Sequence, residues 1–377
     1  MPVRQRGVII LGVIILVCAV AAWRWRAGDG RTQKDASPAV APDAPGEARA
    51  PSASPGGRGA GGAGAASGSG SADAAEPAPA RRDGVVAELG WGSGSGQLGR
   101  SRPREGNPEA PMSLAPTSRG GVVVLDQLNG RLMRLGADGG MVGTTRLTQQ
   151  TPQDVTVAKD GTLLVLDRLR DKTVALLDPE TGALKGELPL EGAGIRDTGG
   201  ITGTFVDGDS VYVEKEHGAL VRIGDLSGKA DPTRPEIPGR PSRDGRSYLL
   251  ARIIDARSGR VFVNAVDRQS GTRRYTREYR LQFPVMSLLL LDSDASGTVY
   301  LAVAGELPKA AGSAEGSPGV RLFCLDALDG KVLGQTDLPL TTMPEETFRD
   351  FVVLDEGGVL YQYRTEAGVS LRRANCH

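Results

Sequence analysis

The chain has 377 residues, 39% of them hydrophobic, and its 45 Lys and Arg residues equal its 45 Asp and Glu residues in number. A chain without net charge has no field that would gather nucleic acid, so no nucleic-acid partner is expected. It contains two histidines, His217 and His377, which excludes most zinc, copper and haem sites. We therefore predict neither a metal nor a cofactor.

Residues 1–26 contain an unbroken apolar run from Gly7 to Trp23 with arginines on both sides. About seventeen residues is the lower limit for a helix that spans a bilayer. The run predicts a single-pass N-terminal transmembrane helix, so the membrane is the first expected partner. The alternative is a cleaved signal peptide, cut before Ala22, which would make the protein secreted. Lipid attachment at Cys18 is disfavoured, because the preceding Val17 is bulky.

The charges beside this run conflict under the positive-inside rule. Arg4 and Arg6 precede it, whereas Arg24 and Arg26 come after it. A signal-like run at the very start of the chain favours export of the residues C-terminal to it. We expect the remainder on the extracytoplasmic, periplasmic side.

Residues 27–83 have a different composition, dominated by Gly, Ala, Ser and Pro, with almost no large apolar side chain. Such a segment buries too little apolar surface to offset the entropy lost on ordering. It is predicted to be a disordered linker between the anchor and a folded domain at residues 84–377.

The folded domain repeats a short apolar strand that starts at a Gly, Asp or Ser and recurs at intervals of about 40 to 60 residues. These runs are GGVVVLD from Gly120, DGTLLVLD from Asp160, GDSVYVEK from Gly208, SGRVFVNA from Ser258, SGTVYLAV from Ser296 and GGVLYQYR from Gly357. The pattern predicts an all-β fold, a six-bladed β-propeller of four-stranded antiparallel blades. The last interval contains a polar insertion, Glu306 to Gly319. Because this interval is the longest, a ring of seven blades is an alternative to a ring of six.

Each repeat has the same internal order. The Gly-started run is the inner-to-middle strand, a polar turn and a further strand come next, and a turn such as DPETG or DALDG precedes the outermost strand. Asp126 and Asp167 end equivalent strands. We expect them to bond turn amides and not to form a ring of carboxylates at the axis. His217 is expected to be an exposed turn residue.

Closure of the ring is predicted from the two ends of the folded domain. The last repeat has three strands, and the strand-like run Val85 to Leu89 precedes the first repeat. We expect this run to complete the last blade as its outer strand, which hides sheet edges.

The first repeat resembles the NHL-type repeat of six-bladed propellers, in the TolB-like propeller superfamily. The matching residues are Gly96, Gln97, Leu98, Asp126, Asn129 and Arg131. Leu98 replaces the usual aromatic residue, and later repeats diverge further. The resemblance implies the fold; some relatives of this fold are lactonases and lyases that use an axial pocket.

Two groups of residues are candidate sites. Cys324 and Cys376 would form a disulfide in an oxidising compartment, or remain unpaired thiols. In RRYTREYR, alternation places Arg273, Tyr275, Arg277 and Tyr279 on one side of a strand. These four side chains are a possible partner-binding patch, and the alternative is a solvated outer strand.

The sequence favours a membrane-tethered, extracytoplasmic and monomeric propeller that acts as an interaction module. It would bind a protein or an envelope polymer and needs no catalytic residue, and we assign none. One alternative is an enzyme of the lactonase or lyase kind with an axial pocket of carboxylate, Asn and Arg side chains. Another is a propeller that binds a small ligand.

Overall fold

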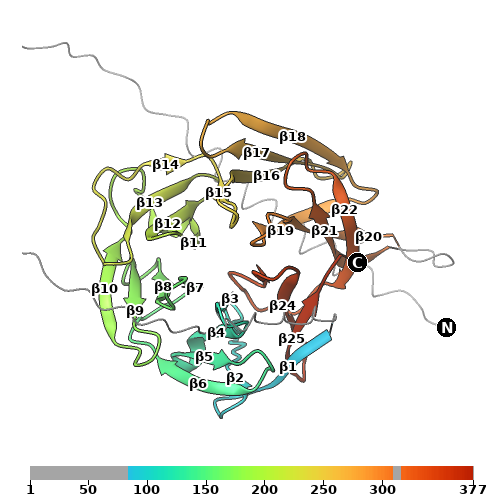
Figure 1. The fold of residues 1–377 in the computed structure, drawn as a ribbon. Helices are drawn as coiled ribbons and strands as arrows, with labels where there is room; N and C mark the ends of the chain where they lie inside the picture. Colours follow the sequence, from blue (N-terminus) through green and yellow to red (C-terminus); the bar gives the residue numbers. More distant parts are fainter. Residues whose placement is uncertain (1–83, 309–315, 377) are drawn as a thin grey trace, which may run out of the picture. The chain divides into compact units, whose positions relative to one another are not determined.

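The computed structural model describes residues 84–308 and 316–376, which form six antiparallel sheets arranged as blades around an axis (Figure 1). The prediction of a six-bladed β-propeller with four-stranded blades is confirmed, and the described chain contains no seventh sheet. The apolar run 7–23 and the linker 27–83 lie outside the described residues. Within the described part, no helix has the length and hydrophobicity to cross a bilayer.

In blades 1 to 5 the strands run in chain order from the inside of the blade to its rim. Blade 1 contains β3 (Ser113–Pro116), β4 (Val122–Asp126), β5 (Arg131–Leu135) and β6 (Met141–Arg146). Blade 2 contains β7 (Asp154–Val157), β8 (Leu163–Asp167), β9 (Thr173–Leu177) and β10 (Leu184–Pro189). Blade 3 contains β11 (Ile201–Asp207), β12 (Ser210–Lys215), β13 (Leu220–Asp225) and β14 (Glu236–Ile237).

The longest strands of the ring are in blades 4 and 5. Blade 4 contains β15 (Arg240–Pro241), β16 (Ser247–Asp255), β17 (Arg260–Asp267) and β18 (Arg273–Arg280). Blade 5 contains β19 (Val285–Ser293), β20 (Val299–Leu307), β21 (Ser317–Leu325) and β22 (Val332–Pro339). Blade 6 contains β23 (Phe351–Val353), β24 (Val359–Arg364), β25 (Gly368–Ala374) and β1 (Gly84–Trp91), with β2 (Gln97–Leu98) beside β1. Two short 3-10 turns are η1 (Gln127–Asn129) and η2 (Thr198–Gly200).

Ring closure agrees with the prediction. Strand β1 pairs antiparallel with β25, with Gly84 opposite Arg373 and Gly90 opposite Gly368. The first described strand of the chain is therefore the fourth strand of the last blade (Figure 1). This pairing covers the edge of β25, which would otherwise be exposed.

Apolar clusters hold neighbouring blades together. In the second strands of blades 1 and 2, β4 and β8, every residue is buried. Five buried clusters join blade pairs 1–2, 2–3, 4–5, 5–6 and 6–1. Each fully buried Val or Leu contributes about 1.5–3 kcal/mol relative to an exposed one.

The contact between blades 3 and 4 differs, because no such cluster joins them in the described chain. Arg268 of blade 4 donates two hydrogen bonds to Asp207 of blade 3, at 3.1 and 2.5 Å. The same guanidinium lies 5.1 Å from the ring centroid of Tyr248. The seam between blades 3 and 4 is thus more polar than the other blade contacts.

The structure corrects the sequence assignment within blade 4. The pattern predicts a second strand in the run from Ser258, but that run leads into β17, the third strand of the blade. The second strand is β16, which comes after the turn at Asp244 and Gly245. Both turns contain an Asp, a Ser and a Gly, so the turn residues alone do not distinguish the two strands.

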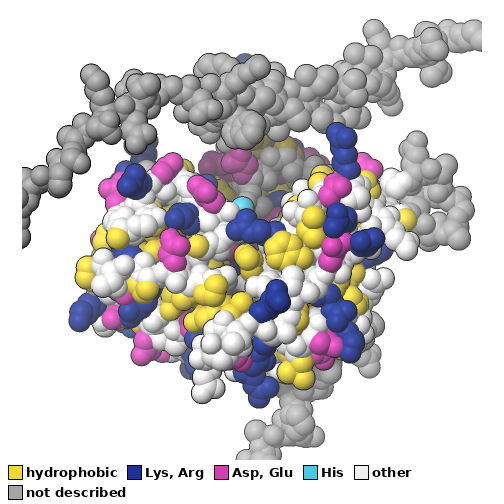
Figure 2. Space-filling view, turned by 90° about the horizontal axis from the view of Figure 1, so that it is seen from above, with side chains coloured by type: hydrophobic (Ala, Val, Ile, Leu, Met, Phe, Trp, Pro, Cys, Tyr) yellow, Lys and Arg dark blue, Asp and Glu magenta, His cyan; other side chains and the backbone are white. Residues whose placement is uncertain are grey.

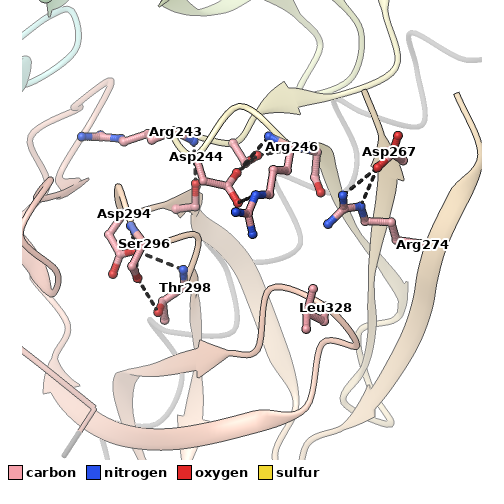
Figure 3. A network of polar contacts seen from close by, with 12 residues as sticks. Arg243, Asp244, Arg246, Asp267, Arg274, Asp294, Ser296, Thr298 and Leu328 are labelled. Carbon is pink, nitrogen blue, oxygen red and sulfur yellow. Dashed lines mark hydrogen bonds and ion pairs between the residues drawn. The ribbon is translucent and has the colours of Figure 1, made fainter. Parts of the chain in front are cut away.

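Aspartate-centred turns close the blades at one face of the ring, and Figure 3 shows several of them in blades 4 and 5. Asp294 accepts hydrogen bonds from the amides of Ser296 and Thr298 at 2.9 and 3.0 Å. Asp267 bonds the guanidinium of Arg274 at 2.6 Å. Short polar side chains that bond their own turn are the reason Asp dominates these positions.

Candidate functional site

The two faces of the ring differ in the loops they carry. At one face the chain crosses from the outer strand of one blade to the inner strand of the next, and the loops between second and third strands lie there as well. We call this the crossover face; the turns of Asp244, Asp267 and Asp294 lie on the opposite face. In Figure 2, Lys and Arg side chains are interspersed with Asp and Glu side chains on the described surface. Neither positive nor negative side chains dominate that view.

The centre of the ring contains a buried ion pair. Asp154, at the start of inner strand β7, has a fully buried side chain and meets Nη2 of Arg349 at 2.5 Å. Its carboxylate also accepts hydrogen bonds from the Ser113 hydroxyl at 2.6 Å and the Thr204 amide at 2.9 Å. Burial raises the pKa of Asp154, and Arg349 and these donors oppose that rise. The Asp154 carboxylate therefore connects blades 1, 2, 3 and 6, and both of its oxygens accept hydrogen bonds from these neighbours.

Two arginines share one aromatic ring beside this pair. The guanidinium carbons of Arg240 and Arg349 lie 4.1 and 5.1 Å from the ring centroid of Phe205, on inner strand β11. Burial lowers the pKa of Arg240, and this effect outweighs the opposing negative charges of Glu214 and Asp292. Two guanidinium groups therefore lie against one half-buried aromatic ring, and carboxylates stand beside both of them.

Glu214, at the end of β12, is the acidic neighbour of this group. Its carboxylate lies 3.7 Å from Arg240 and 3.6 Å from Nδ1 of His217, and it accepts a hydrogen bond from Thr202 at 2.9 Å. Burial acts to raise the pKa of Glu214, but these three contacts outweigh it and lower the pKa. His217 has a left-handed backbone and a side chain that is 81% exposed, as expected of a turn residue.

A third arginine extends the group towards the crossover face. Arg168 comes directly after β8, and its guanidinium donates to the carbonyls of Gly199 and Ile201 at 2.9 and 2.5 Å. It lies 5.1 Å from the ring centroid of Phe348, and its buried Nε has no partner among the described residues. Burial lowers the pKa of Arg168. No carboxylate forms an ion pair with it in the described chain.

The crossover face also bears an apolar surface at blades 4 and 5. Ile253 and Ile254, near the end of β16, are 37% and 43% exposed, and Met286, at the start of β19, is 60% exposed. The Val285 amide donates to the carbonyl of Ala256 at 2.8 Å, which places Met286 beside the end of β16. Exposed large side chains that adjoin one another mark interaction surfaces more often than single ones do.

The residues of the first repeat form a structural clamp. Asp126 accepts from the amide of Gly99 at 2.9 Å, from Asn129 at 2.8 Å and from Arg131 at 2.8 Å. Arg131 also donates to the carbonyl of Gln97 at 2.8 Å. The network holds the Gly-rich segment after β1 against blade 1.

Asp167 has the equivalent role in blade 2. It accepts from the amides of Leu169 and Arg170, and from the amide and hydroxyl of Thr151. Burial opposes a low pKa here, but these hydrogen bonds hold the pKa of Asp167 below its usual value. The expectation of bonds to turn amides is confirmed for Asp167, whereas Asp126 accepts from the distant Gly99 amide and from two side chains and bonds no amide of its own turn.

The predicted patch on β18 is not an accessible surface in the form expected. Tyr275 and Tyr279 are only 9% and 8% exposed, because both pack against blade 5. The Tyr279 hydroxyl donates to the carbonyl of Gly330 at 2.5 Å, and Arg277 donates to the carbonyl of Asp329 at 2.8 Å. Gly330 has φ 69°, and an added Cβ would lie 2.6 Å from the Tyr275 ring. Of the four residues, Arg273 alone is fully exposed.

Cys324 and Cys376 lie together near the opposite face. The structure joins them by a disulfide, with a Cα–Cα distance of 5.9 Å. Cys324 is in β21 of blade 5, and Cys376 lies just after β25 of blade 6. The bond fastens the last described residue of the chain to the neighbouring blade.

A shallow hollow of about 500 Å³ lies next to the clamp. It is lined by Trp91, Arg100, Leu128 and Asn129 together with backbone of the Gly-rich segment. Arg100 lies 4.8 Å from the Trp91 ring centroid and pairs with Glu366 at 2.9 Å. Among the described residues, no group of three His, Cys, Asp or Glu side chains has the arrangement of a metal site.

Comparison with known proteins gives likeness of fold without a family. No protein-family model and no curated protein matches this sequence. Among solved structures, Kuenenia stuttgartiensis hydrazine synthase is 18% identical, with a TM-score of 0.44 over 69% of this chain and 75% of that chain. A streptogramin B lyase is 10% identical, with a TM-score of 0.40 over 72% and 96%. BamB from Moraxella catarrhalis is 11% identical, with a TM-score of 0.36 over 78% and 100%.

Identities and TM-scores this low carry no function from those proteins to this one. The resemblance of the first repeat to NHL repeats remains a likeness to six-bladed propellers.

Proposed function

We propose that this chain is a membrane-tethered β-propeller that binds a protein partner outside the cytoplasm and has no catalytic role. The observation that carries the proposal is the contrast between the axis and the crossover face. At the axis, Asp154 and Glu214 are held by several donors each. At the crossover face, Ile253, Ile254 and Met286 are exposed together.

Two further features support a location outside the cytoplasm, next to the membrane. The disulfide between Cys324 and Cys376 suits an oxidising compartment, where such bonds form and persist. The apolar run 7–23 has the composition of a membrane anchor, and the segment 27–83 has that of a flexible tether. An anchored propeller on a tether would search for its partner near the membrane surface.

The proposal predicts that a charge at Met286 removes the partner. The full-length protein and its Met286→Lys variant are cross-linked in membranes and purified, and bound proteins are identified by mass spectrometry. Leu333→Lys is the matched control, because Leu333 is 57% exposed but lies on outer strand β22. We expect one recurrent partner with the wild type and the control, reduced at least about tenfold with Met286→Lys. Absence of any recurrent partner from the wild type would contradict the proposal.

A second candidate function is the binding of a small anion at the axis. It is favoured by the arginines Arg168, Arg240 and Arg349, which outnumber the carboxylates that pair with them there. Calorimetric titration of the full-length protein with citrate tests it. The candidate predicts saturable binding that Arg240→Gln removes and Arg246→Gln, on the opposite face, does not. Heat no greater than that of dilution would exclude citrate-like anions from the axis.

A further inference from the structure

The inner strand of blade 4 is too short to cover its neighbour. Strand β15 pairs with β16 at two positions, Arg240 with Leu249 and Pro241 with Tyr248. Strand β16 continues to Asp255 and pairs along its other edge with β17. From Leu250 onwards, no described strand covers the inner edge of β16.

This uncovered edge lies at the crossover face. Six residues, Leu250 to Asp255, extend over about 17 Å. Backbone groups along one edge of a strand alternate between its two neighbours, so half of these residues direct N–H and C=O groups towards the axis. The last four residues are all exposed, which shows that the strand end is open on its faces as well. Open strand edges pair readily with another chain.

The side chains on either side of this edge differ in chemistry. On the side towards blade 5, Ala251 packs against the apolar cluster that includes Val285 and Leu301, and Ile253 continues the same row. The half-buried Leu288 of β19 packs on this side, and the exposed Met286 lies two residues before it in the same strand. An added strand would therefore meet an apolar row on the blade 5 side.

The side towards blade 3 is basic. The guanidinium of Arg252 lies 3.1 Å from the position that a Cβ of Gly218 would take, so it reaches the loop after β12. Arg252 is exposed and has no ion pair among the described residues. Arg240 is opposite Leu249 and donates to the carbonyl of Leu291 in blade 5, so it does not belong to this side. The charge of Arg252, which has no ion pair among the described residues, favours an acidic side chain opposite it.

We propose that β16 accepts an extended segment of a partner protein as an added inner strand of blade 4. The segment alternates apolar side chains, on the side of Ala251 and Ile253, with acidic side chains, on the side of Arg252. Main-chain hydrogen bonds supply affinity and the alternate side chains supply specificity, as in other strand additions. The inference rests on the proposed function, because it names how the partner binds.

A peptide-display selection on the full-length protein tests this directly. Random twelve-residue peptides are selected against the wild type, and the enriched peptides are sequenced and titrated. The expected result is a pattern that alternates apolar with acidic residues, with binding weakened at least about tenfold by Arg252→Glu. Arg246→Glu, an exposed arginine on the opposite face, is the matched control and should bind as the wild type does. Hydrogen exchange with the bound peptide should protect the amides of residues 250–255.

N-methylation of the peptide separates strand pairing from simple charge attraction. Methyl groups on alternate amides that face β16 should abolish binding, whereas methyl groups on the other amides should not. Enriched peptides without alternation, protection elsewhere, or binding that survives both methylation patterns would overturn the inference. Pairing of two β16 edges in a homodimer, detected by sedimentation and lost with Arg252→Glu, would also overturn it. If the Met286-dependent partner is still recovered in those cases, the proposed function stands and only the strand addition fails.

Discussion

Replacing Cys376 with serine is expected to lower the free energy of unfolding by about 2–4 kcal/mol. The disulfide to Cys324 closes a loop with a sequence separation of 52 residues, and restricting the unfolded chain in this way is worth about 4 kcal/mol in the chain-entropy model. Both cysteines are buried, at 3% and 4% exposure, so the bond lies within packed structure. The loss should extend to ring closure, because Cys376 lies just after β25, the partner of β1.

Urea unfolding of the oxidised full-length protein provides the measurement. Cys324→Ser and the double variant should match Cys376→Ser, because each removes the same bond. Reduction of the wild type should give the same midpoint as the variants and should leave the variants unchanged. Equal midpoints for the wild type and Cys376→Ser before reduction would show that the bond does not form in the protein.

Replacing Asp154 with asparagine is expected to lower the free energy of unfolding by about 3–5 kcal/mol. The substitution keeps the shape of the side chain but removes the charge that compensates Arg349, which is 19% exposed. A buried charge left without its partner destabilises a protein by this amount. The Ser113 hydroxyl and the Thr204 amide would also face an altered acceptor.

A second substitution separates charge from packing. Asp154→Asn combined with Arg349→Met should be less destabilising than Asp154→Asn alone, because no unpaired charge remains. Glu278→Gln, which breaks a surface pair with Arg260 at 2.8 Å, is the control and should change stability little. An Asp154→Asn variant as stable as Glu278→Gln would contradict the structural role assigned to the axis.

The fold is largely predictable from the sequence because its signals are local. Each blade repeats a Gly-started strand and an Asp-containing turn, and these turns require residues that accept left-handed or self-bonding conformations. The closing strand Val85–Leu89 is predictable because the last repeat contains only three strands. In blade 4 the pattern places the second strand one strand too late, because the turns before β16 and before β17 carry the same residues.

The candidate site is much less predictable. Asp154 and Arg349 are 195 residues apart, and nothing near either residue signals the other. The alternation in β18 correctly places Tyr275 and Tyr279 on one side, but it does not show that this side faces blade 5. The short β15 has no signal either, because a two-residue strand has no periodicity. Contacts set by the arrangement of blades around an axis leave no local pattern in the chain.

The central claim is that the crossover face of blades 4 and 5 is where the partner binds. Site-specific photo-cross-linking in membranes tests it, with a photoreactive residue at Met286 or at Leu328 of the full-length protein. The two positions are similarly exposed, at 60% and 66%, and both belong to blade 5, but Leu328 lies in a turn of the opposite face (Figure 3). The account predicts one protein adduct from Met286 and none from Leu328. An adduct from Leu328 alone, or from neither position, would contradict it.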